Sequence, residues 1–484
     1  MAVSFDRQIE HLLRRAGFGA RRDELDTFRQ QSIRGAVALL IDYESVPDDV
    51  DQKIQQAGYV QVTTRGAFSP RTVIADARQR WLFRMVHGNR PLQEKMTLFW
   101  HNHFATAYSK IAGIFGGDEA TRYMAAKASE DPGGVRGQIE MLRDHALGNF
   151  RDILVEIAKD TAMLVWLDGY TNLRARPQEN FGREILELFT MGIGHYTEAD
   201  VYAAARVFTG WNLQRPGVGD ARRYTFLYNP NQHDPTEKTF TFPIYPDGRK
   251  TIPARPAADG MRDGLDFIDA LAAHPETGPR LARKLFQFFV SEVAEPPAGF
   301  LNRVSAVYYR SRYDMRSVLR EVLLSPEFWD DRSYFSRYSW PVEFVVRAIK
   351  DVGWRGFSVN DALAPLNNMG QTLYEPPDVN GWDPGRGWFS TGATLARMNF
   401  AATLTFNQRF NLANAATAYG QSPETLLNYV VEGLPTAPMD AAVVGELSNY
   451  LQSTGAWTGS ATQLQNKTAG LAHLIVGSAE YQLV

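Results

Sequence analysis

Along most of the chain, apolar residues recur every three to four positions, the spacing of one face of an α-helix. This period changes between residues 220 and 256, where the segments 223–228 and 238–242 alternate like short strands on either side of a turn-rich stretch at 229–235. The pattern therefore predicts an all-α, predominantly helical, multi-helix globular fold with a small inserted β-hairpin near 223–243.

The length of 484 residues exceeds the ~250–300 residues at which single hydrophobic cores stop growing, so two or three cores are expected. Interruptions of the helical period divide the chain into four predicted regions. These are an N-terminal helical region (1–115), a central helical region with the hairpin (116–260), a second helical region with a Trp-bearing loop (261–410) and a C-terminal helical region (411–484).

The charge and the cysteine content exclude several classes of function. The formal net charge of −3 gives no basic surface for nucleic acid, and the absence of cysteine removes disulfides and thiolate ligands. No apolar run approaches the ~18 residues of a transmembrane segment, and the N-terminus has no signal-peptide core. We expect a cytoplasmic protein, or a periplasmic or exported one if a signal was removed.

The first candidate cluster is the run Phe-Trp-His-Asn-His-Phe at 99–104. Positions two apart on a continuing helix point ~200° apart, so His101 and His103 could share a metal or substrate only if the helix ends near Trp100. Histidine also suits acid–base work near neutral pH. The alternative is a pair of histidines bonded to backbone in an aromatic core, with Asn102 between them.

The second cluster is the helix predicted at 179–191. Asn180, Arg183, Glu184 and Glu187 share one face, whereas the other faces carry apolar residues. A solvated polar stripe is one interpretation. If the helix is buried, its carboxylates need an arginine, a metal or a shared proton.

Three loops supply further candidates. Residues 192–200 form a loop that ends in a Thr197–Asp200 capping box, residues 229–236 form the turn of the hairpin, and residues 376–391 are rich in proline, glycine and tryptophan. Aromatic side chains beside an arginine suit a substrate that stacks or is negatively charged. The residues of interest in these loops are His195, Tyr196, His233, Trp382, Arg386 and Trp388.

The leading hypothesis is an enzyme that performs acid–base or metal-assisted hydrolysis or elimination on a polar substrate such as a carbohydrate. Its expected catalytic residues are His101, His103, Arg183, Glu184, Glu187 and His195. Its expected substrate-binding residues are Asn102, Asn180, Tyr196, His233, Trp382, Arg386 and Trp388. A divalent metal, Zn²⁺ or Fe²⁺, is compatible with His101, His103 and Glu184 as ligands. The alternative is a non-catalytic helical scaffold that binds a protein or glycan, with the same residues forming a buried His/Glu/Arg network.

Several motifs together resemble a bacterial family catalogued as domain of unknown function 1800. They are residues 11–19, 98–106, 180–192, 208–211, 376–382 and 395–400, in the family's order. The resemblance covers nearly the whole chain and implies no established reaction. It implies that the clusters at 99–104 and 179–191 and the Trp-bearing loop belong together. It also implies an extracytoplasmic role and a sulfatase-like partner encoded nearby.

Overall fold

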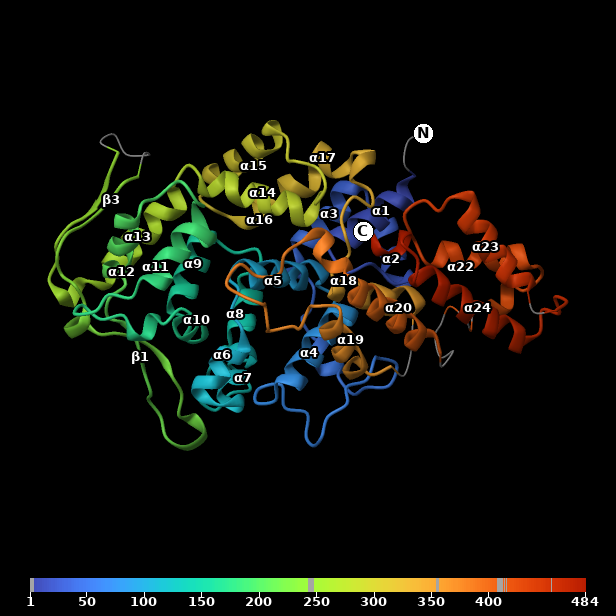
Figure 1. Ribbon diagram of the computed structural model, residues 1–484, viewed down its shortest axis with the longest axis horizontal. Coiled ribbons are helices and arrows are strands. Elements are labelled where there is room, and N and C mark those ends of the chain that lie inside the picture. Colours follow the sequence, from blue (N-terminus) through green and yellow to red (C-terminus); the bar gives the residue numbers. More distant parts are fainter. Residues whose placement is uncertain are drawn as a thin grey trace.

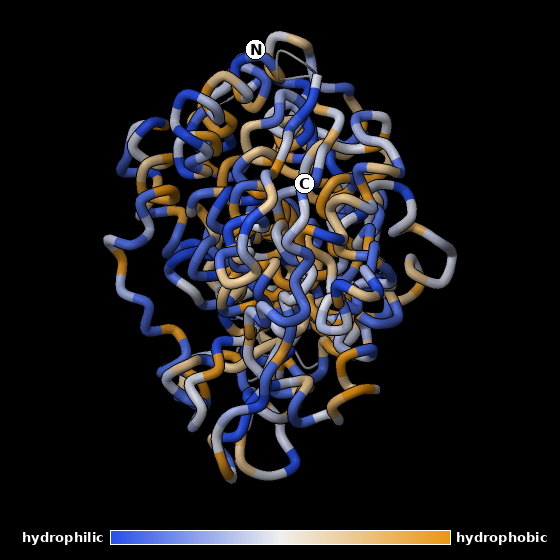
Figure 2. Tube along the Cα trace, turned by 90° about the vertical axis from the view of Figure 1, so that its left-hand side faces the viewer, coloured by the Kyte–Doolittle hydropathy of each residue, from blue (hydrophilic) through white to orange (hydrophobic). Residues whose placement is uncertain are grey.

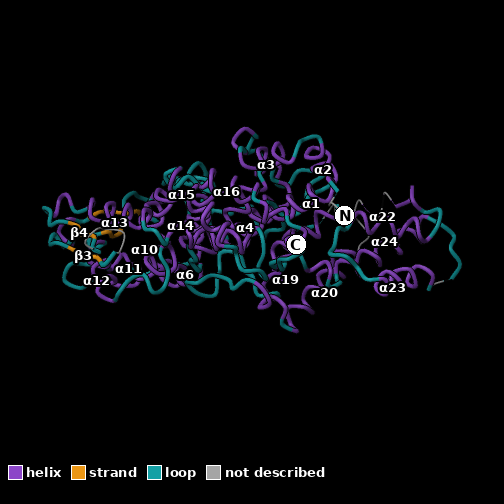
Figure 3. The backbone as a smooth tube through the Cα atoms, turned by 90° about the horizontal axis from the view of Figure 1, so that it is seen from above, coloured by secondary structure: helices purple, strands orange, loops and turns teal. Residues whose placement is uncertain are grey.

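The computed structural model describes residues 4–242, 248–353, 357–406, 412, 414, 416–453 and 455–484. Helices dominate these residues, and the few strands lie at one end of the elongated molecule (Figures 1 and 3). The predicted fold class, all-α with a small β-hairpin insert, is confirmed.

The helices before residue 170 are α1 (Phe5–Arg15), α2 (Arg22–Arg29), α3 (Ile33–Ile41), α4 (Ile74–His87), α5 (Pro91–His103), α6 (Tyr108–Phe115), α7 (Gly117–Ala125), α8 (Gln138–Asp144), α9 (Phe150–Lys159) and α10 (Thr161–Trp166). Then follow α11 (Glu179–Glu184), α12 (Glu198–Val207), α13 (Met261–Ala273), α14 (Thr277–Phe289), α15 (Ala298–Arg310), α16 (Met315–Leu324), α17 (Pro326–Trp329), α18 (Pro341–Val352), α19 (Leu363–Asn368), α20 (Thr391–Phe406), α22 (Pro423–Gly433), α23 (Ala441–Gln452) and α24 (Ala461–Val476). No helix within the described ranges is long and apolar enough to cross a membrane.

The strands β1 (Trp211–Gln214), β2 (Thr225–Tyr228), β3 (Lys238–Phe240) and β4 (Lys250–Ile252) form two separate antiparallel pairs. The segments 223–228 and 238–242 were expected to pair with each other, and this pairing is wrong. β2 pairs with β1, Trp211 lying opposite Tyr228, and β3 pairs with β4. The segment between β2 and β3 is therefore not the turn of a hairpin, and His233 within it is fully buried.

The buried apolar side chains form one connected cluster from Ile9 to Tyr481, instead of the two or three separate cores expected from length. The cause is packing between helices that are distant in sequence: α3 contacts α16, and α4 contacts α18. Hydrophobic segments accordingly gather inside the molecule (Figure 2). α5 lies near the middle of the molecule, and helices α22–α24 lie at the end opposite the strands (Figure 1).

Candidate functional site

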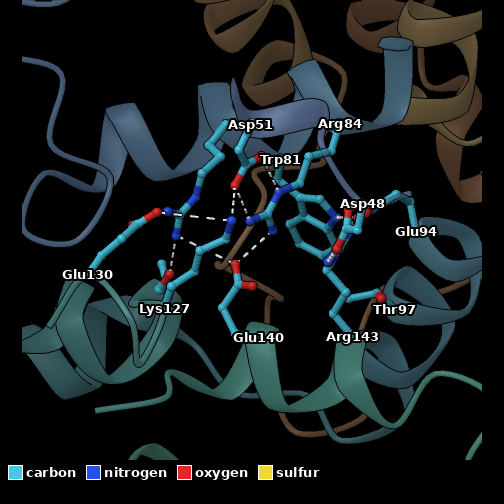
Figure 4. A network of polar contacts seen from close by, with 12 residues as sticks. Asp48, Asp51, Trp81, Arg84, Glu94, Thr97, Lys127, Glu130, Glu140 and Arg143 are labelled. Atoms are coloured by element: carbon cyan, nitrogen blue, oxygen red, sulfur yellow. Dashed lines mark hydrogen bonds and ion pairs between the residues drawn. The ribbon is translucent and has the colours of Figure 1, made fainter. Parts of the chain in front are cut away.

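Buried charged residues hold α5 in place from two sides. Glu94 accepts hydrogen bonds from Trp81 Nε1 on α4 (3.1 Å) and from Arg143 Nε on α8 (2.6 Å) (Figure 4). Lys95, the next residue, forms a fully buried ion pair with Glu343 on α18. Helix positions 94 and 95 point about 100° apart, so these contacts fix both the rotation and the position of α5.

The ion pairs around Glu94 continue into a larger network between α4 and α8 (Figure 4). Arg84 binds Asp51 with two hydrogen bonds (2.7 and 2.8 Å) and Glu140 with one (2.7 Å). Burial raises the pKa of Glu140, but Arg84 and Arg80 lower it overall. This network is buried and paired, as the scaffold alternative requires, but it contains none of the residues that the sequence singled out.

His101 lies in a cage of aromatic rings. α5 continues through His103, so the two histidines point to different sides of the helix. The centroid of the His101 ring lies 5.7 Å from that of Trp81, 6.2 Å from that of Tyr374 and 5.5 Å from that of Trp382. Neither ring nitrogen has a hydrogen-bond partner among the described residues, and burial lowers the pKa of His101 to about 3. His101 is therefore a neutral core residue.

His103 has two polar partners. Its Nε2 lies 3.1 Å from the carbonyl oxygen of Phe189, and its Nδ1 lies 3.0 Å from Lys284 Nζ on α14. A carbonyl oxygen only accepts, so Nε2 carries the proton and Nδ1 accepts from Lys284. Burial, with the charges of Lys284 and Arg280, holds the pKa of His103 well below its usual value. A neutral imidazole with a fixed tautomer therefore faces the lysine.

Lys284 is half-buried and has no carboxylate within 4.0 Å among the described residues. Burial, together with the nearby charge of Arg280, lowers the pKa of Lys284 to about 7. A lysine with this pKa is partly neutral at physiological pH, and a neutral amine can act as a base or a nucleophile.

Lys284 and His103 line a pocket of about 140 Å³, which we call the α5–α14 pocket. The pocket lies between the end of α5, the helix α14 and the Trp-bearing loop. Its lining residues are Phe99, Asn102, His103, Lys284, Gln287, Phe288, Glu292, Trp340, Asn380, Trp382, Asp383 and Pro384. Two of the sequence clusters, at 99–104 and 376–391, thus meet here.

Asn102 joins the Trp-bearing loop to α5. Its Oδ1 accepts a hydrogen bond from the backbone N–H of Trp382 (2.6 Å), and its Nδ2 donates to the Trp382 carbonyl (3.4 Å). Gly381 makes the approach sterically feasible, since it has a φ of +86° and a Cβ there would lie 2.5 Å from the Asn102 backbone oxygen. Asn102 therefore positions the loop that forms one wall of the pocket.

Glu292 supplies a buried carboxylate on the opposite wall. Its side chain is 3% exposed and accepts hydrogen bonds from Trp340 Nε1 (2.9 Å) and from the Tyr338 backbone (3.2 Å). Arg337 Nε lies 3.3 Å from the same carboxylate. Burial outweighs these contacts and raises the pKa of Glu292.

The predicted helix at 179–191 is α11 followed by a π-helix at Ile185–Thr190. Wide π-turns are frequent at functional sites. The carbonyl groups of its last turn lack partners in the helix, so Phe189 can accept from His103 and Leu188 from Arg280 (3.2 Å). The π-helix thus contributes to the site through its backbone.

The carboxylates on this helix lie outside the pocket lining. Glu187 accepts a hydrogen bond from Tyr196, and burial and the charge of Glu187 raise the pKa of Glu184 to about 7. Arg183 opposes this increase only in part, because it binds the exposed Glu198 through two hydrogen bonds of 2.8 Å. Glu184 and Glu187 are both half-buried, and the charge of Glu187 acts on Arg280 of α14.

Other predicted residues lie elsewhere. The Thr197–Asp200 capping box is present at the start of α12, and His195 before it faces Glu276 at 3.8 Å. His233 was expected at the turn of the hairpin, as a substrate-binding residue. It is instead fully buried between the Thr209 carbonyl (2.8 Å) and Asp263 (3.2 Å).

Asn180 is exposed and donates to Asp168 (3.0 Å). In the Trp-bearing loop, Trp382 lines the pocket, whereas Trp388 is buried beside Trp340 and Arg386 is exposed near Tyr338. Of the loop residues singled out from the sequence, only Trp382 reaches the pocket.

The expected metal ligands do not come together. His101 is enclosed by aromatic rings, His103 has both nitrogens occupied, and Glu184 lies outside the lining of the pocket that contains His103. Within the described part of the chain, no group of three or more His, Asp or Glu residues could hold a metal ion. These donors do not fit a metal site.

Sequence reasoning missed Lys284, Arg280 and Glu292. The first two occupy the polar face of α14, whose apolar face includes Leu281 and Leu285. Polar residues on an amphipathic helix are usually solvated, so their spacing gave no sign that α5 and the π-helix cover them. The basic pair at i, i+4 was the only available signal.

The chain matches the family model described as "Protein of unknown function (DUF1800)" over residues 11–483. No curated protein and no solved structure matches it. The match spans nearly the whole chain and includes α5, α14 and the Trp-bearing loop, so it confirms the resemblance seen in the motifs. The chain belongs to the DUF1800 family.

Proposed function

We propose that the α5–α14 pocket is an active site and that the chain is an enzyme that moves protons to and from a small polar substrate. Hydrolysis or elimination on a carbohydrate or similar compound is the reaction class that these side chains suit. The observation that carries the proposal is Lys284: it lines the pocket, has no carboxylate partner within 4.0 Å in the described residues, and has a pKa of about 7.

Other side chains of the pocket have roles that complement that of Lys284. His103 accepts from Lys284 and fixes the direction of its amino group. Glu292 also lines the pocket and has a raised pKa, so a second titratable group faces the same space. Phe99, Phe288, Trp340 and Trp382 line the pocket too, and apolar walls strengthen electrostatic interactions with a bound substrate.

A first test measures the basicity of Lys284 without needing a substrate. The protein is treated briefly with acetic anhydride at pH 5 to 10, and the acetylation of each lysine is quantified by peptide mass spectrometry. At pH 7 about half of Lys284 is neutral, against roughly 1 in 3,000 for an unperturbed lysine. Lys53 is a matched reference, because it is also partly buried but pairs with Asp49 at 2.9 Å.

A second test measures catalysis with a panel of chromogenic glycosides and esters and of acidic polysaccharides whose elimination products absorb ultraviolet light. Replacing a general base typically lowers the rate 10²- to 10⁴-fold. Lys284→Met is therefore expected to lose at least 100-fold of an activity that Lys53→Met retains. Full activity in Lys284→Met, or acetylation of Lys284 no faster than that of Lys53, contradicts the proposal. The sulfatase-like partner and the cellular location stay predictions.

A further inference from the structure

We propose that Lys284 is a nucleophile that forms an imine with an aldehyde or ketone substrate in the α5–α14 pocket. This inference rests on the proposed function and deepens it, because it names the substrate class as carbonyl compounds. It requires a lysine that is accessible from a pocket, free of a carboxylate counter-ion, and held with its lone pair directed toward the substrate.

Comparison with Lys95 shows what is unusual about Lys284. Lys95 is fully buried, forms an ion pair with Glu343, and does not line the pocket. Burial lowers the pKa of Lys95 to about 8, and its ion pair with Glu343 holds the amino group in the core. Lys284 has a neutral imidazole as its polar partner instead, and it lines the pocket.

The hydrogen bond to His103 is compatible with every stage of imine formation. The neutral amine has two N–H groups and a lone pair, and His103 Nδ1 accepts one of these N–H groups. The lone pair and the second N–H remain for the substrate. A protonated imine keeps one N–H, so the same hydrogen bond to His103 can persist after the reaction.

The step balances without an oxidant or reductant. The lone pair of Lys284 Nζ attacks the carbonyl carbon, and the carbonyl oxygen takes up the second N–H proton to give a carbinolamine. Uptake of one further proton lets this hydroxyl group leave as water, and the C=N bond forms. Solvent supplies that proton, and Glu292, whose pKa burial raises, also lines the pocket.

The pocket volume limits the size of the substrate. A volume of about 140 Å³ is close to the ~150 Å³ cavity that accommodates benzene, so about six non-hydrogen atoms fit inside. Glyceraldehyde has this size and carries both a carbonyl and polar hydroxyl groups. The open-chain form of a larger sugar can place its carbonyl end in the pocket with the remainder outside.

The experiment traps the imine in the full-length protein. The protein is incubated with glyceraldehyde and sodium cyanoborohydride at pH 6.5, and the reduced adduct at each lysine is quantified by peptide mass spectrometry. We expect at least tenfold higher occupancy at Lys284 than at Lys53 or Lys95. The adduct should disappear in Lys284→Met and persist in Lys53→Met. Lys284→Arg, which keeps a cationic side chain, replaces Lys284→Met if circular dichroism shows that the latter is unfolded.

The outcomes separate this inference from the proposed function. If Lys284 is acetylated rapidly at pH 7 but forms no more adduct than Lys53, the imine is refuted and a general base remains. If Lys284 is no more reactive than Lys53 in both experiments, the imine and the proposed function both fail. Selective adduct formation at Lys284 supports the imine.

Discussion

Replacing Gly381 with alanine tests whether the contact between Asn102 and the Trp-bearing loop forms the pocket wall. Gly385 provides a matched control in the same loop, because both glycines have a φ of +86°. A Cβ at Gly381 would lie 2.5 Å from the Asn102 backbone oxygen, whereas a Cβ at Gly385 would meet no atom within 4 Å. The two substitutions therefore share the backbone strain and differ in the steric clash.

The expected loss of folding free energy in each variant follows from these contacts. A left-handed conformation costs an L-residue about 1–2 kcal/mol, and this applies to both variants. Gly381→Ala must in addition separate the loop from Asn102, which breaks the two hydrogen bonds to Trp382 at about 1 kcal/mol each. We expect destabilisation of about 3–4 kcal/mol for Gly381→Ala and about 1–2 kcal/mol for Gly385→Ala.

Urea unfolding followed by tryptophan fluorescence measures both values. In an Asn102→Ala background, the hydrogen bonds are already absent, so the extra loss caused by Gly381→Ala should shrink. The accessibility of Lys284 to acetic anhydride should also change in Gly381→Ala and stay the same in Gly385→Ala. Equal destabilisation by the two alanines would refute the idea that Asn102 holds the loop against α5.

Three further predictions concern buried titratable groups. Glu343→Gln should lower the free energy of unfolding by about 3 kcal/mol at pH 7, because it removes the shared counter-ion of Arg337 and Lys95. The pKa of Glu343 is about 2, so this contribution is present above pH 4.5 and is lost as the pH falls toward 2. An equal loss at pH 7 and pH 2 in urea unfolding contradicts this. The pKa of Lys284 is lowered from 10.5 to about 7, so the wild type should gain stability between pH 7 and 10.5, and Lys284→Met should lack that gain. Parallel stability curves for the two proteins would show that Lys284 titrates normally. His101→Phe should change the stability by less than about 1 kcal/mol, because neither ring nitrogen has a partner to lose. A loss above 3 kcal/mol in thermal unfolding would reveal an essential polar contact at His101.

Periodicity predicted the helices well because it reflects burial of one face, which local sequence encodes directly. The strand pairing failed because alternation identifies a strand but not its partner. Residues 225–228 could pair forward or backward, and they pair backward with 211–214, while His233 in the following segment contacts Thr209 and Asp263. These contacts of His233 join separate segments of the chain, and no local sequence pattern predicts them.

The candidate site was predictable only in part, because local motifs were visible but their contacts were not. The motifs at 99–104 and 376–391 were recognised as related, and Asn102 and Trp382 do meet. The roles of the two histidines depend on where α5 ends: the helix continues to His103, which sends His101 into the core and His103 toward Lys284. The sequence cannot specify whether α5 ends at residue 100 or at residue 103, since helix ends are the least certain feature of such predictions.

The contrast between Lys95 and Lys284 is the strongest physical reason to place chemistry in this pocket. Lys95 lies on α5 and Lys284 contacts its end, and among the described residues only Lys95 has a carboxylate partner. An amino group held without a counter-ion destabilises the folded state, and a methionine or leucine at position 284 would remove that cost. Residues that reduce stability in this way are typical of sites where function requires them. His103, the neutral partner of Lys284, is held in turn by a hydrogen bond to the carbonyl of Phe189 on a π-helix. Three elements distant in sequence thus meet at this amine, as the proposed reactivity of Lys284 requires.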